Sequence, residues 1–295
     1  MSTNSRKGII LAGGSGTRLY PLTLAVSKQL LPVYDKPMIY YPLSTLILSN
    51  IRDILIITTQ EQQNQFKELL RDGKHFGCNI QYEIQHQPRG ISESLIIGEK
   101  FIGDSSVALV LGDNIFYGDE FNDNLTEISK LDTNCVFGYK VSNPQDYGVV
   151  EFNRVCGCNE VVGIEEKPVN PKSKYAVPGL YFYDNNVVPI AKSLKPSPRG
   201  ELEITTLNNI LIQNNKLEVK LMRDNVAWFD TGSPDHLFEA TMFVKAIQSR
   251  TGTMIGCIEE CSYRRGFITR DQLVNTGTFY KNCHYGKYIL NKYDV

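Results

Sequence analysis

A cluster of glycines and cations follows the first apolar segment of the chain. The apolar run 8–11 is followed, after Ala12, by Gly13-Gly14-Ser15-Gly16-Thr17-Arg18, and Lys28 lies ten residues beyond the arginine. Glycines let backbone N–H groups come close to phosphate oxygens because they have no Cβ. The two cations suit a triphosphate whose pyrophosphate leaves as charge builds on it. A tight turn with a surface arginine and a solvated lysine fits the same spacing.

Two well-known phosphate motifs do not match this loop. The third glycine of the dinucleotide fingerprint is missing after Gly16, and no Gly-Lys-Ser/Thr sequence forms a Walker loop. The loop therefore indicates phosphate binding, and its chemistry has to be inferred from other segments.

Short apolar runs alternate with helix-like segments through the first half of the chain. The strand-like runs are 8–11, 54–58, 80–84 and 107–111. Helical spacing appears between them, in Leu43, Leu46 and Ile47, in Phe66, Leu69 and Leu70, and in the segment around 95–97. This alternation predicts an α/β, Rossmann-like fold with a mixed, mostly parallel sheet and helices on both faces.

The second half of the chain has a different texture. The β-rich stretches 135–141, 148–152 and 180–183 predict a mixed or antiparallel extension packed on the first sheet. A helix is expected from Pro234, because Leu237, Thr241 and Val244 share one helical face. Since no linker or repeat interrupts the 295 residues, we expect a single domain, 1–295, with a helical C-terminal tail at about 234–295.

Composition narrows the partners and the compartment. A net charge of -1 gives no reason to expect nucleic acid or a membrane surface as a partner. No run of about 18 apolar residues occurs, and the apolar stretch near the N-terminus breaks at glycines, so a cytoplasmic protein is expected. The seven cysteines are interpreted as reduced thiols. Neither Cys156 and Cys158 nor the four histidines show the spacing of a metal site.

Six ordered segments resemble the sugar-1-phosphate nucleotidylyltransferases. They are the loop with SKQLLPVYDKPMIYYPL (27–43), LVLGDNIFYG (109–118), YGVVEF (147–152), EEKP (165–168), RGELEIT (199–205) and WFDTG (228–232). Within that family, the chain is most similar to members that make dTDP-glucose from dTTP and glucose 1-phosphate. The resemblance implies the nucleotide-diphospho-sugar transferase fold and an in-line attack of the sugar phosphate on the α-phosphorus of the nucleotide. Because the nucleophile is already an anion, positioning and charge neutralisation matter more than a general base.

The resemblance also implies roles for individual residues. Arg18 and Lys28 would contact the triphosphate, Lys167 would hold the sugar phosphate, and Asp113 and Asp230 would together bind Mg²⁺, which seldom needs a full protein cage. The implied nucleotide-binding residues are Leu11, Gly13, Gly14, Ser15, Gly16, Thr17, Gln29, Gln85, Pro88 and Gly90, with Gln85 at the thymine edge. The implied sugar-binding residues, within about 114–230, are Asn114, Tyr147, Gly148, Glu166, Val177 and Trp228.

Several residues depart from the family pattern and leave the substrates open. Arg89 stands where an acidic residue is common, Ile91-Ser92-Glu93-Ser94 replaces a Leu-Ala-Gln-Ala type of run, Pro178 replaces a small polar residue, and Thr205 replaces an aspartate. The alternatives are another sugar 1-phosphate, such as an N-acetylhexosamine or amino sugar, or UTP in place of dTTP. A further alternative is an inactive nucleotide-sugar sensor.

The resemblance further implies a homotetramer inhibited by dTDP-rhamnose at a second nucleotide site between subunits. In this chain the corresponding positions are Tyr117, Gly118, Glu260 and Arg264. Cys261 replaces an apolar branched residue in this segment. The alternative is that the C-terminal tail is only an interface or a cap on the core.

Overall fold

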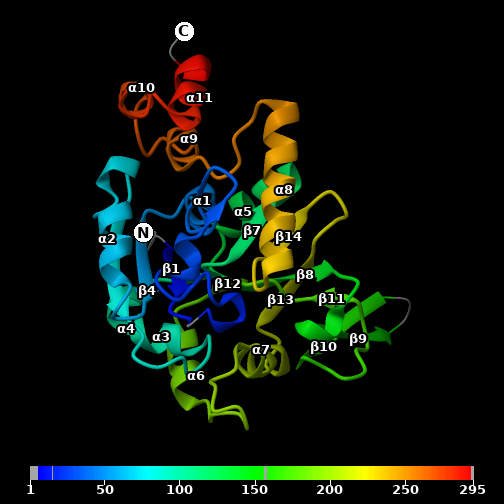
Figure 1. Ribbon diagram of the computed structural model, residues 1–295. Coiled ribbons are helices and arrows are strands. Elements are labelled where there is room, and N and C mark those ends of the chain that lie inside the picture. Colours follow the sequence, from blue (N-terminus) through cyan, green and yellow to red (C-terminus); the bar gives the residue numbers. More distant parts are fainter. Residues whose placement is uncertain (1–5, 15, 156–157, 294–295) are drawn as a thin grey trace.

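The computed structural model describes residues 6–14, 16–155 and 158–293, and in this part of the chain a ten-stranded mixed sheet forms the centre (Figure 1). Its strands, from one edge to the other, are β10 (Cys158–Glu166), β9 (Gly148–Val155), β11 (Tyr175–Ala176), β8 (Asn134–Lys140), β12 (Leu180–Tyr183), β6 (Val107–Leu111), β1 (Lys7–Ala12), β4 (Asp53–Thr58) and β5 (Asn79–Ile84), and β13 (Leu217–Leu221) pairs with β8 off this path. Strands β6, β1, β4 and β5 are mutually parallel. The predicted fold class is confirmed.

Helices cover both faces of the parallel strands. Neighbouring side chains of a strand point to opposite faces of the sheet, so each strand packs against both sets of helices. Ile10 and Ile56 pack with one set of helices: α1 (Tyr40–Leu48), α2 (Gln63–Leu70), α5 (Asp119–Ile128) and α9 (Ile258–Arg264). Ile9 and Leu55 pack with the other set: α3 (Glu93–Ile97), α4 (Glu99–Ile102), α6 (Val187–Ser193) and α7 (Ile204–Gln213). The strands are therefore apolar on both sides, which is why they read as continuous apolar runs in the sequence.

The antiparallel strands extend the same sheet. β12 pairs antiparallel with both β6 and β8, so the predicted extension continues the sheet edge instead of packing on its face. Within this extension, β9 and β10 pair antiparallel. Cys156 and Gly157, between these two strands, and Ser15 of the glycine loop lie outside the described residues.

Two small sheets complete the region around the site. β7 (Asn114–Tyr117) pairs antiparallel with β14 (Ala227–Asp230), which sets Asp230 opposite Asn114. β2 (Pro32–Val33) pairs with β3 (Lys36–Pro37). The first of these pairings joins two segments that are far apart in the sequence, at the end of β6.

The C-terminal part is helical, as predicted. α8 (Pro234–Thr251) begins at the expected proline, and the Ser233 side chain caps it by accepting from the backbone N–H of His236 at 3.2 Å. It is followed by α9, α10 (Arg270–Phe279) and α11 (His284–Tyr293), which lie together at one end of the molecule (Figure 1). In the described part of the chain, no helix combines the length and apolar character that a membrane span requires.

The carboxylate of Glu260 joins α9 to α11. Its side chain is only 3% exposed and accepts hydrogen bonds from Tyr288, from Lys292 at 2.9 Å and from Tyr293 at 3.0 Å, while it also pairs with Arg264. Burial acts to raise the pKa of Glu260, but these hydrogen bonds and charges outweigh it and hold the pKa below its ordinary value. The ionised form is therefore favoured by folding.

We expect Glu260→Gln to lower the free energy of unfolding at neutral pH by about 1–3 kcal/mol, since charged hydrogen bonds are lost. A carboxylate whose pKa is lowered by folding stabilises the fold above its unfolded pKa, and this contribution disappears as the pH falls through the folded pKa. Urea denaturation between about pH 3 and pH 7 should thus show a difference that shrinks in acid. The exposed Glu68→Gln serves as the control, and a pH-independent difference would contradict the prediction.

Candidate active site

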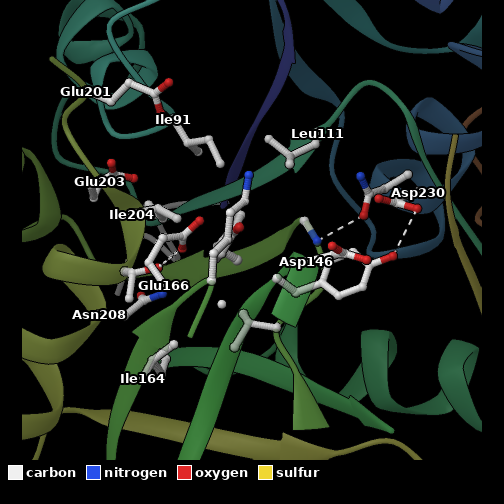
Figure 2. A pocket seen from close by; sticks show the side chains of 18 of the residues that line it. Ile91, Leu111, Asp146, Ile164, Glu166, Glu201, Glu203, Ile204, Asn208 and Asp230 are labelled. Carbon is white, nitrogen blue, oxygen red and sulfur yellow. Dashed lines mark hydrogen bonds between the residues drawn. The ribbon is translucent and has the colours of Figure 1, made fainter. Parts of the chain in front are cut away.

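Two adjoining cavities lie at the carboxyl edge of the parallel strands. The carboxylate cavity, of about 270 Å³, is lined by six acidic and three basic side chains: Asp113, Asp146, Glu166, Glu201, Glu203 and Asp230, with Arg18, Lys167 and Arg199. Figure 2 labels Asp146, Glu166, Glu201, Glu203 and Asp230 around this cavity. The glycine-loop cavity, of about 340 Å³, is lined among others by Gly14, Gly16, Thr17, Lys28, Gln29 and Pro88. Arg18, Asp113 and Glu201 line both cavities. These three residues mark the place where a molecule in one cavity would meet a molecule in the other.

The parallel strands bring the glycine loop and Asp113 together. β1 and β6 are neighbours, and beyond them the Gly112 N–H donates to the carbonyl oxygen of Leu11 at 2.9 Å. The loops after both strands therefore leave the sheet side by side, at the edge where α/β proteins bind ligands. Leu11, one of the predicted nucleotide-binding residues, therefore connects the ends of β1 and β6 through its backbone carbonyl group.

Lys28 and Asp113 form an ion pair with Nζ and Oδ2 2.5 Å apart. Asn114 also donates from Nδ2 to Asp113 Oδ1 at 2.8 Å. Burial acts to raise the pKa of Asp113, but the Lys28 charge and the hydrogen bonds from Lys28 and Asn114 together outweigh it, so the pKa lies below the ordinary value. Lys28 is itself buried and lines the glycine-loop cavity. Its ammonium group can therefore exchange the Asp113 carboxylate for a phosphate oxygen that binds in this cavity.

Asp230 faces Asp113 from the neighbouring β14 strand. Tyr147 donates from its hydroxyl to Asp230 Oδ1 at 3.3 Å, and His236 Nδ1 lies 2.8 Å from the same oxygen. Burial raises the pKa of Asp230, and the negative charge of Asp113 adds to the rise. Two carboxylates that repel each other in this way form a site where a cation is favourable.

The donor set fits Mg²⁺. Among the described residues, no group of three or more His, Cys, Asp or Glu side chains could hold a metal ion. A pair of carboxylates is nevertheless enough for Mg²⁺, which keeps waters and takes further oxygen ligands from substrate phosphates. Asp113 and Asp230 are the residues that would hold it.

The guanidinium of Arg18 lies against a backbone that has no side chain. A Cβ on Gly232 would be 3.2 Å from Arg18 Nη2 and 3.3 Å from Nη1. Gly232 lies two residues after Asp230. The sequence WFDTG therefore supplies both the Asp230 carboxylate and, at its glycine, the space that the Arg18 guanidinium occupies. The arginine is solvent-exposed and directed into the junction of the two cavities.

Tyr147 and Trp228, the two aromatic residues among the predicted sugar-binding residues, form one wall of the carboxylate cavity. The rings of Tyr147 and Trp228 are 5.1 Å apart, and Trp228 Nε1 donates to Asn114 Oδ1 at 2.7 Å. Asn114 Oδ1 also accepts from the Gly179 N–H at 3.0 Å, and Asn114 is 2% exposed. Its hydrogen bonds to protein groups show that it positions this wall.

The opposite wall is built around the Glu166 carboxylate. Thr205 donates from its hydroxyl to Glu166 Oε2 at 2.6 Å, and Arg199 Nη2 lies 3.6 Å from Glu166 Oε1. A Cβ on Gly148 would be 3.3 Å from both Glu166 Oε2 and Thr205 Oγ1, which explains the glycine there. Figure 2 shows the labelled Glu166 beside Glu203 and Asn208 on this side of the cavity.

We expect Thr205→Val to raise the KM for the ligand of the carboxylate cavity about three- to tenfold, because Glu166 loses a hydrogen bond that fixes its carboxylate. The KM for the ligand of the glycine-loop cavity should not change. Steady-state kinetics with each substrate varied in turn provide the measurement. Thr205→Ser, which keeps the hydroxyl, should restore the wild-type KM, and equal effects of both variants would contradict the prediction.

Lys167 has an unusual backbone. Its φ is +46°, a conformation that costs free energy for a residue other than glycine, and its N–H donates to the Tyr147 carbonyl at 2.9 Å. The lysine directly follows Glu166 at the end of β10 and lines the carboxylate cavity. Val177 joins the same wall, with its N–H bonded to the Gly148 carbonyl at 2.8 Å.

A third cavity, the Gln85 cavity of about 130 Å³, contains Gly13, Gln85 and Pro88 in its wall. Gly90 has a φ of +98°, and a Cβ there would be 2.6 Å from the carbonyl oxygen of Leu202. The glycine therefore allows residues 89–92 to lie against the segment 199–205. This contact connects the predicted nucleotide-binding segment with the wall of the carboxylate cavity.

The residues expected in a second nucleotide site fall on different elements. Tyr117 ends β7 and packs against Phe243 of α8, with ring centroids 5.7 Å apart, and Gly118 precedes α5. Glu260 and Arg264 pair with each other on α9. A regulatory role for these four residues remains a prediction.

Some cavity residues were not among the predicted site residues. Arg199 forms a bidentate pair with Glu203, with Nη2 2.9 Å from each carboxylate oxygen, and also approaches Glu166. The sequence could have indicated Arg199 as a site residue, because it begins the charged motif RGELEIT. Asp146 directly precedes the predicted Tyr147 in the sequence and lines the same cavity. His236 had no such signal, because only the fold brings its ring to Asp230.

Comparison with known proteins identifies the family of this chain. The profile of the family described as nucleotidyl transferase matches residues 7–247. A glucose-1-phosphate thymidylyltransferase of Mycolicibacterium smegmatis is 51% identical over 288 residues, covering 98% of this chain and 99% of the relative. One from Neisseria meningitidis serogroup A is 52% identical over 285 residues, covering 96% and 98%. The chain therefore belongs to the nucleotidyl transferase family and is an enzyme of that class. Its relatives at about half identity carry the particular name glucose-1-phosphate thymidylyltransferase, which confirms the predicted resemblance.

Solved structures show the same fold. The crystal structure of a Bacillus anthracis protein described as a glucose-1-phosphate thymidylyltransferase, in complex with sucrose, has a TM-score of 0.74 and 39% identity, covering 81% of this chain and 95% of that one. A UDP-glucose pyrophosphorylase complexed with UDP-glucose has a TM-score of 0.72 at 22% identity, covering 83% and 100%. The latter likeness concerns the fold alone.

Proposed function

We propose that this enzyme transfers the thymidylyl group of dTTP to glucose 1-phosphate. An oxygen of the sugar phosphate attacks the α-phosphorus, a new P–O bond forms, the bond to the β-phosphate oxygen breaks, and dTDP-glucose and pyrophosphate result. The main support is the junction between the carboxylate cavity and the glycine-loop cavity, because Arg18 and Asp113 line both. Two substrates that meet there can react in line.

The glycine-loop cavity would hold the triphosphate. Gly13, Gly14, Gly16 and Thr17 offer backbone N–H groups, and Lys28 beside Asp113 offers a cation. Arg18 would stabilise the charge that builds on the leaving pyrophosphate, since its guanidinium lies at the junction. Gln85, Pro88 and Gly13 would surround the thymine.

The carboxylate cavity would hold glucose 1-phosphate. Lys167 lines this cavity and would bind the phosphate, and the Glu166 carboxylate can accept hydrogen bonds from sugar hydroxyls. Thr205 holds that carboxylate, and Gly148 leaves room for it. With six acidic side chains around the cavity, an anionic substrate requires cations beside it, and Lys167 and Arg18 supply two of them.

Mg²⁺ is proposed as the cofactor, held by Asp113 and Asp230. When bound, it neutralises phosphate charge and polarises the phosphoryl oxygens. Tyr147 and His236 keep the Asp230 carboxylate in place, and Asn114 does the same for Asp113. These neighbours fix the direction in which both carboxylates point.

A matrix of pyrophosphate-release assays tests the proposal. dTTP, UTP, dCTP, ATP and GTP are each combined with glucose 1-phosphate, N-acetylglucosamine 1-phosphate and an amino-sugar 1-phosphate, with and without Mg²⁺. We expect the highest kcat/KM for dTTP with glucose 1-phosphate, and activity only with Mg²⁺. A clearly better pair would replace the substrates while keeping the reaction, and no release with any pair would favour a sensor.

We further propose a cytoplasmic enzyme with one catalytic domain that assembles as a homotetramer. Inhibition by dTDP-rhamnose would involve Tyr117, Gly118, Glu260 and Arg264. Glu260 pairs with Arg264 on α9 and accepts a hydrogen bond from Lys292 on α11. These contacts support a C-terminal segment in which α9 and α11 keep one arrangement. Light scattering and inhibition assays would test assembly and regulation separately.

A further inference from the structure

A carboxylate without a role in the proposed reaction lies behind Gln85. Glu93 begins α3, and its side chain is 16% exposed, while Gln85 is 5% exposed. Gln85 Nε2 donates to Glu93 Oε2 at 2.8 Å. The Arg89 backbone N–H donates to the same oxygen at 3.3 Å. Glu93 thus ties the Gln85 side chain to the loop that carries Pro88 and Gly90.

Glu93 leaves Gln85 only one orientation of its amide group. A glutamine amide has an oxygen that accepts and a nitrogen that donates, and a flip of the terminal group exchanges them. An ionised carboxyl group accepts only, so the nitrogen must face Glu93. The oxygen then faces the glycine loop, and a Cβ on Gly13 would lie 2.5 Å from Gln85 Oε1.

A fixed acceptor in the Gln85 cavity selects among nucleobases. Gly13, Gln85 and Pro88 line this cavity, which is where the proposed function puts the base. Thymine and uracil carry an N3–H that can donate to an amide oxygen, whereas N3 of cytosine is an acceptor. Two acceptors facing each other leave a desolvated pair without a hydrogen bond, which is costly.

We propose that Glu93 is a positioning residue that fixes the Gln85 amide and thereby excludes cytosine nucleotides. A neutral glutamine at position 93 would offer both a donor and an acceptor, so both orientations of Gln85 would find a partner. The acidic residue in this chain removes that freedom. The inference rests on the proposed function, because it requires the base to bind beside Gln85.

The experiment compares kcat/KM for dTTP and dCTP, each with glucose 1-phosphate, in wild type and Glu93→Gln. We expect the dTTP:dCTP ratio to fall about tenfold in the variant, with an unchanged KM for glucose 1-phosphate. Glu99→Gln, the same substitution on the adjacent α4, should leave the ratio as it is, since Glu99 pairs with Lys192 on the surface. Equilibrium binding of dTDP and dCDP gives a second measure that does not depend on turnover.

A double-mutant cycle separates positioning from general damage. Gln85→Ala should lower the ratio by itself, and adding Glu93→Gln should then change it no further. An unchanged ratio in Glu93→Gln, or additive effects of the two substitutions, would overturn the inference. If wild type turned over none of the nucleotides, the proposed function would fail; a wild type that prefers dTTP together with an unaffected Glu93→Gln would reject only the role of Glu93.

Discussion

The Asp113→Asn variant is expected to lose about 10³-fold in kcat at saturating Mg²⁺. Asp113 lines both cavities and faces Asp230, so it is the residue that connects the two substrates with the proposed metal. Asparagine keeps the shape but removes the negative charge that Lys28 pairs with at 2.5 Å. The lysine then loses its partner, and the carboxylate pair for the cation no longer exists.

The measurement is pyrophosphate release with a titration of Mg²⁺, together with thermal unfolding to show that the variant is folded. Asp72→Asn is a matched control, because Asp72 pairs with Lys74 at the surface, away from the cavities. Turnover within about threefold of wild type would show that Asp113 holds no essential metal, and the assignment of Mg²⁺ to this pair would then have to be given up.

Arg18→Gln is expected to lower kcat by about 10²- to 10³-fold, with a smaller change in the KM for dTTP. The guanidinium lies over Gly232, at the place where the α-phosphorus and the leaving group would sit. Its contribution grows as negative charge develops on the departing pyrophosphate, so the transition state loses more than the ground state. Glutamine retains hydrogen-bond donors but has no charge, and therefore isolates the electrostatic part.

Single-turnover and steady-state kinetics together distinguish this role from simple nucleotide binding. The control is Arg250→Gln at the exposed end of α8. If Arg18→Gln raised the KM for dTTP and left kcat unchanged, the arginine would bind the ground state and would not stabilise the leaving group.

Local sequence determined most of the secondary structure and one part of the site. The predicted apolar runs became β1, β4, β5 and β6, because strands buried on both faces need continuous apolar residues. The glycine loop could be recognised because glycine, arginine and lysine within one short segment suit phosphate on chemical grounds alone. Family resemblance then supplied Asp113 and Asp230, which no local pattern would have paired.

The side-chain partners within the site depended on the tertiary structure. The register of β7 with β14 sets Asp230 opposite Asn114, and α8 brings His236 to Asp230. Asn114 and Asp230 are far apart in the chain, and the contact of His236 with Asp230 depends on the direction in which α8 leaves β14, so no periodicity in the sequence encodes either contact.

The sequence by itself therefore determined the strand and helix pattern, the phosphate loop and, through its ordered motifs, the family. Only the tertiary structure decided that Arg18 and Asp113 stand between two cavities, that Thr205 holds Glu166, and that Glu93 orients Gln85. The physical reason is the difference in range. Hydrophobic periodicity and glycine geometry act over a few residues, whereas hydrogen bonds and ion pairs between distant segments arise only after strand pairing has brought the ends of the strands together.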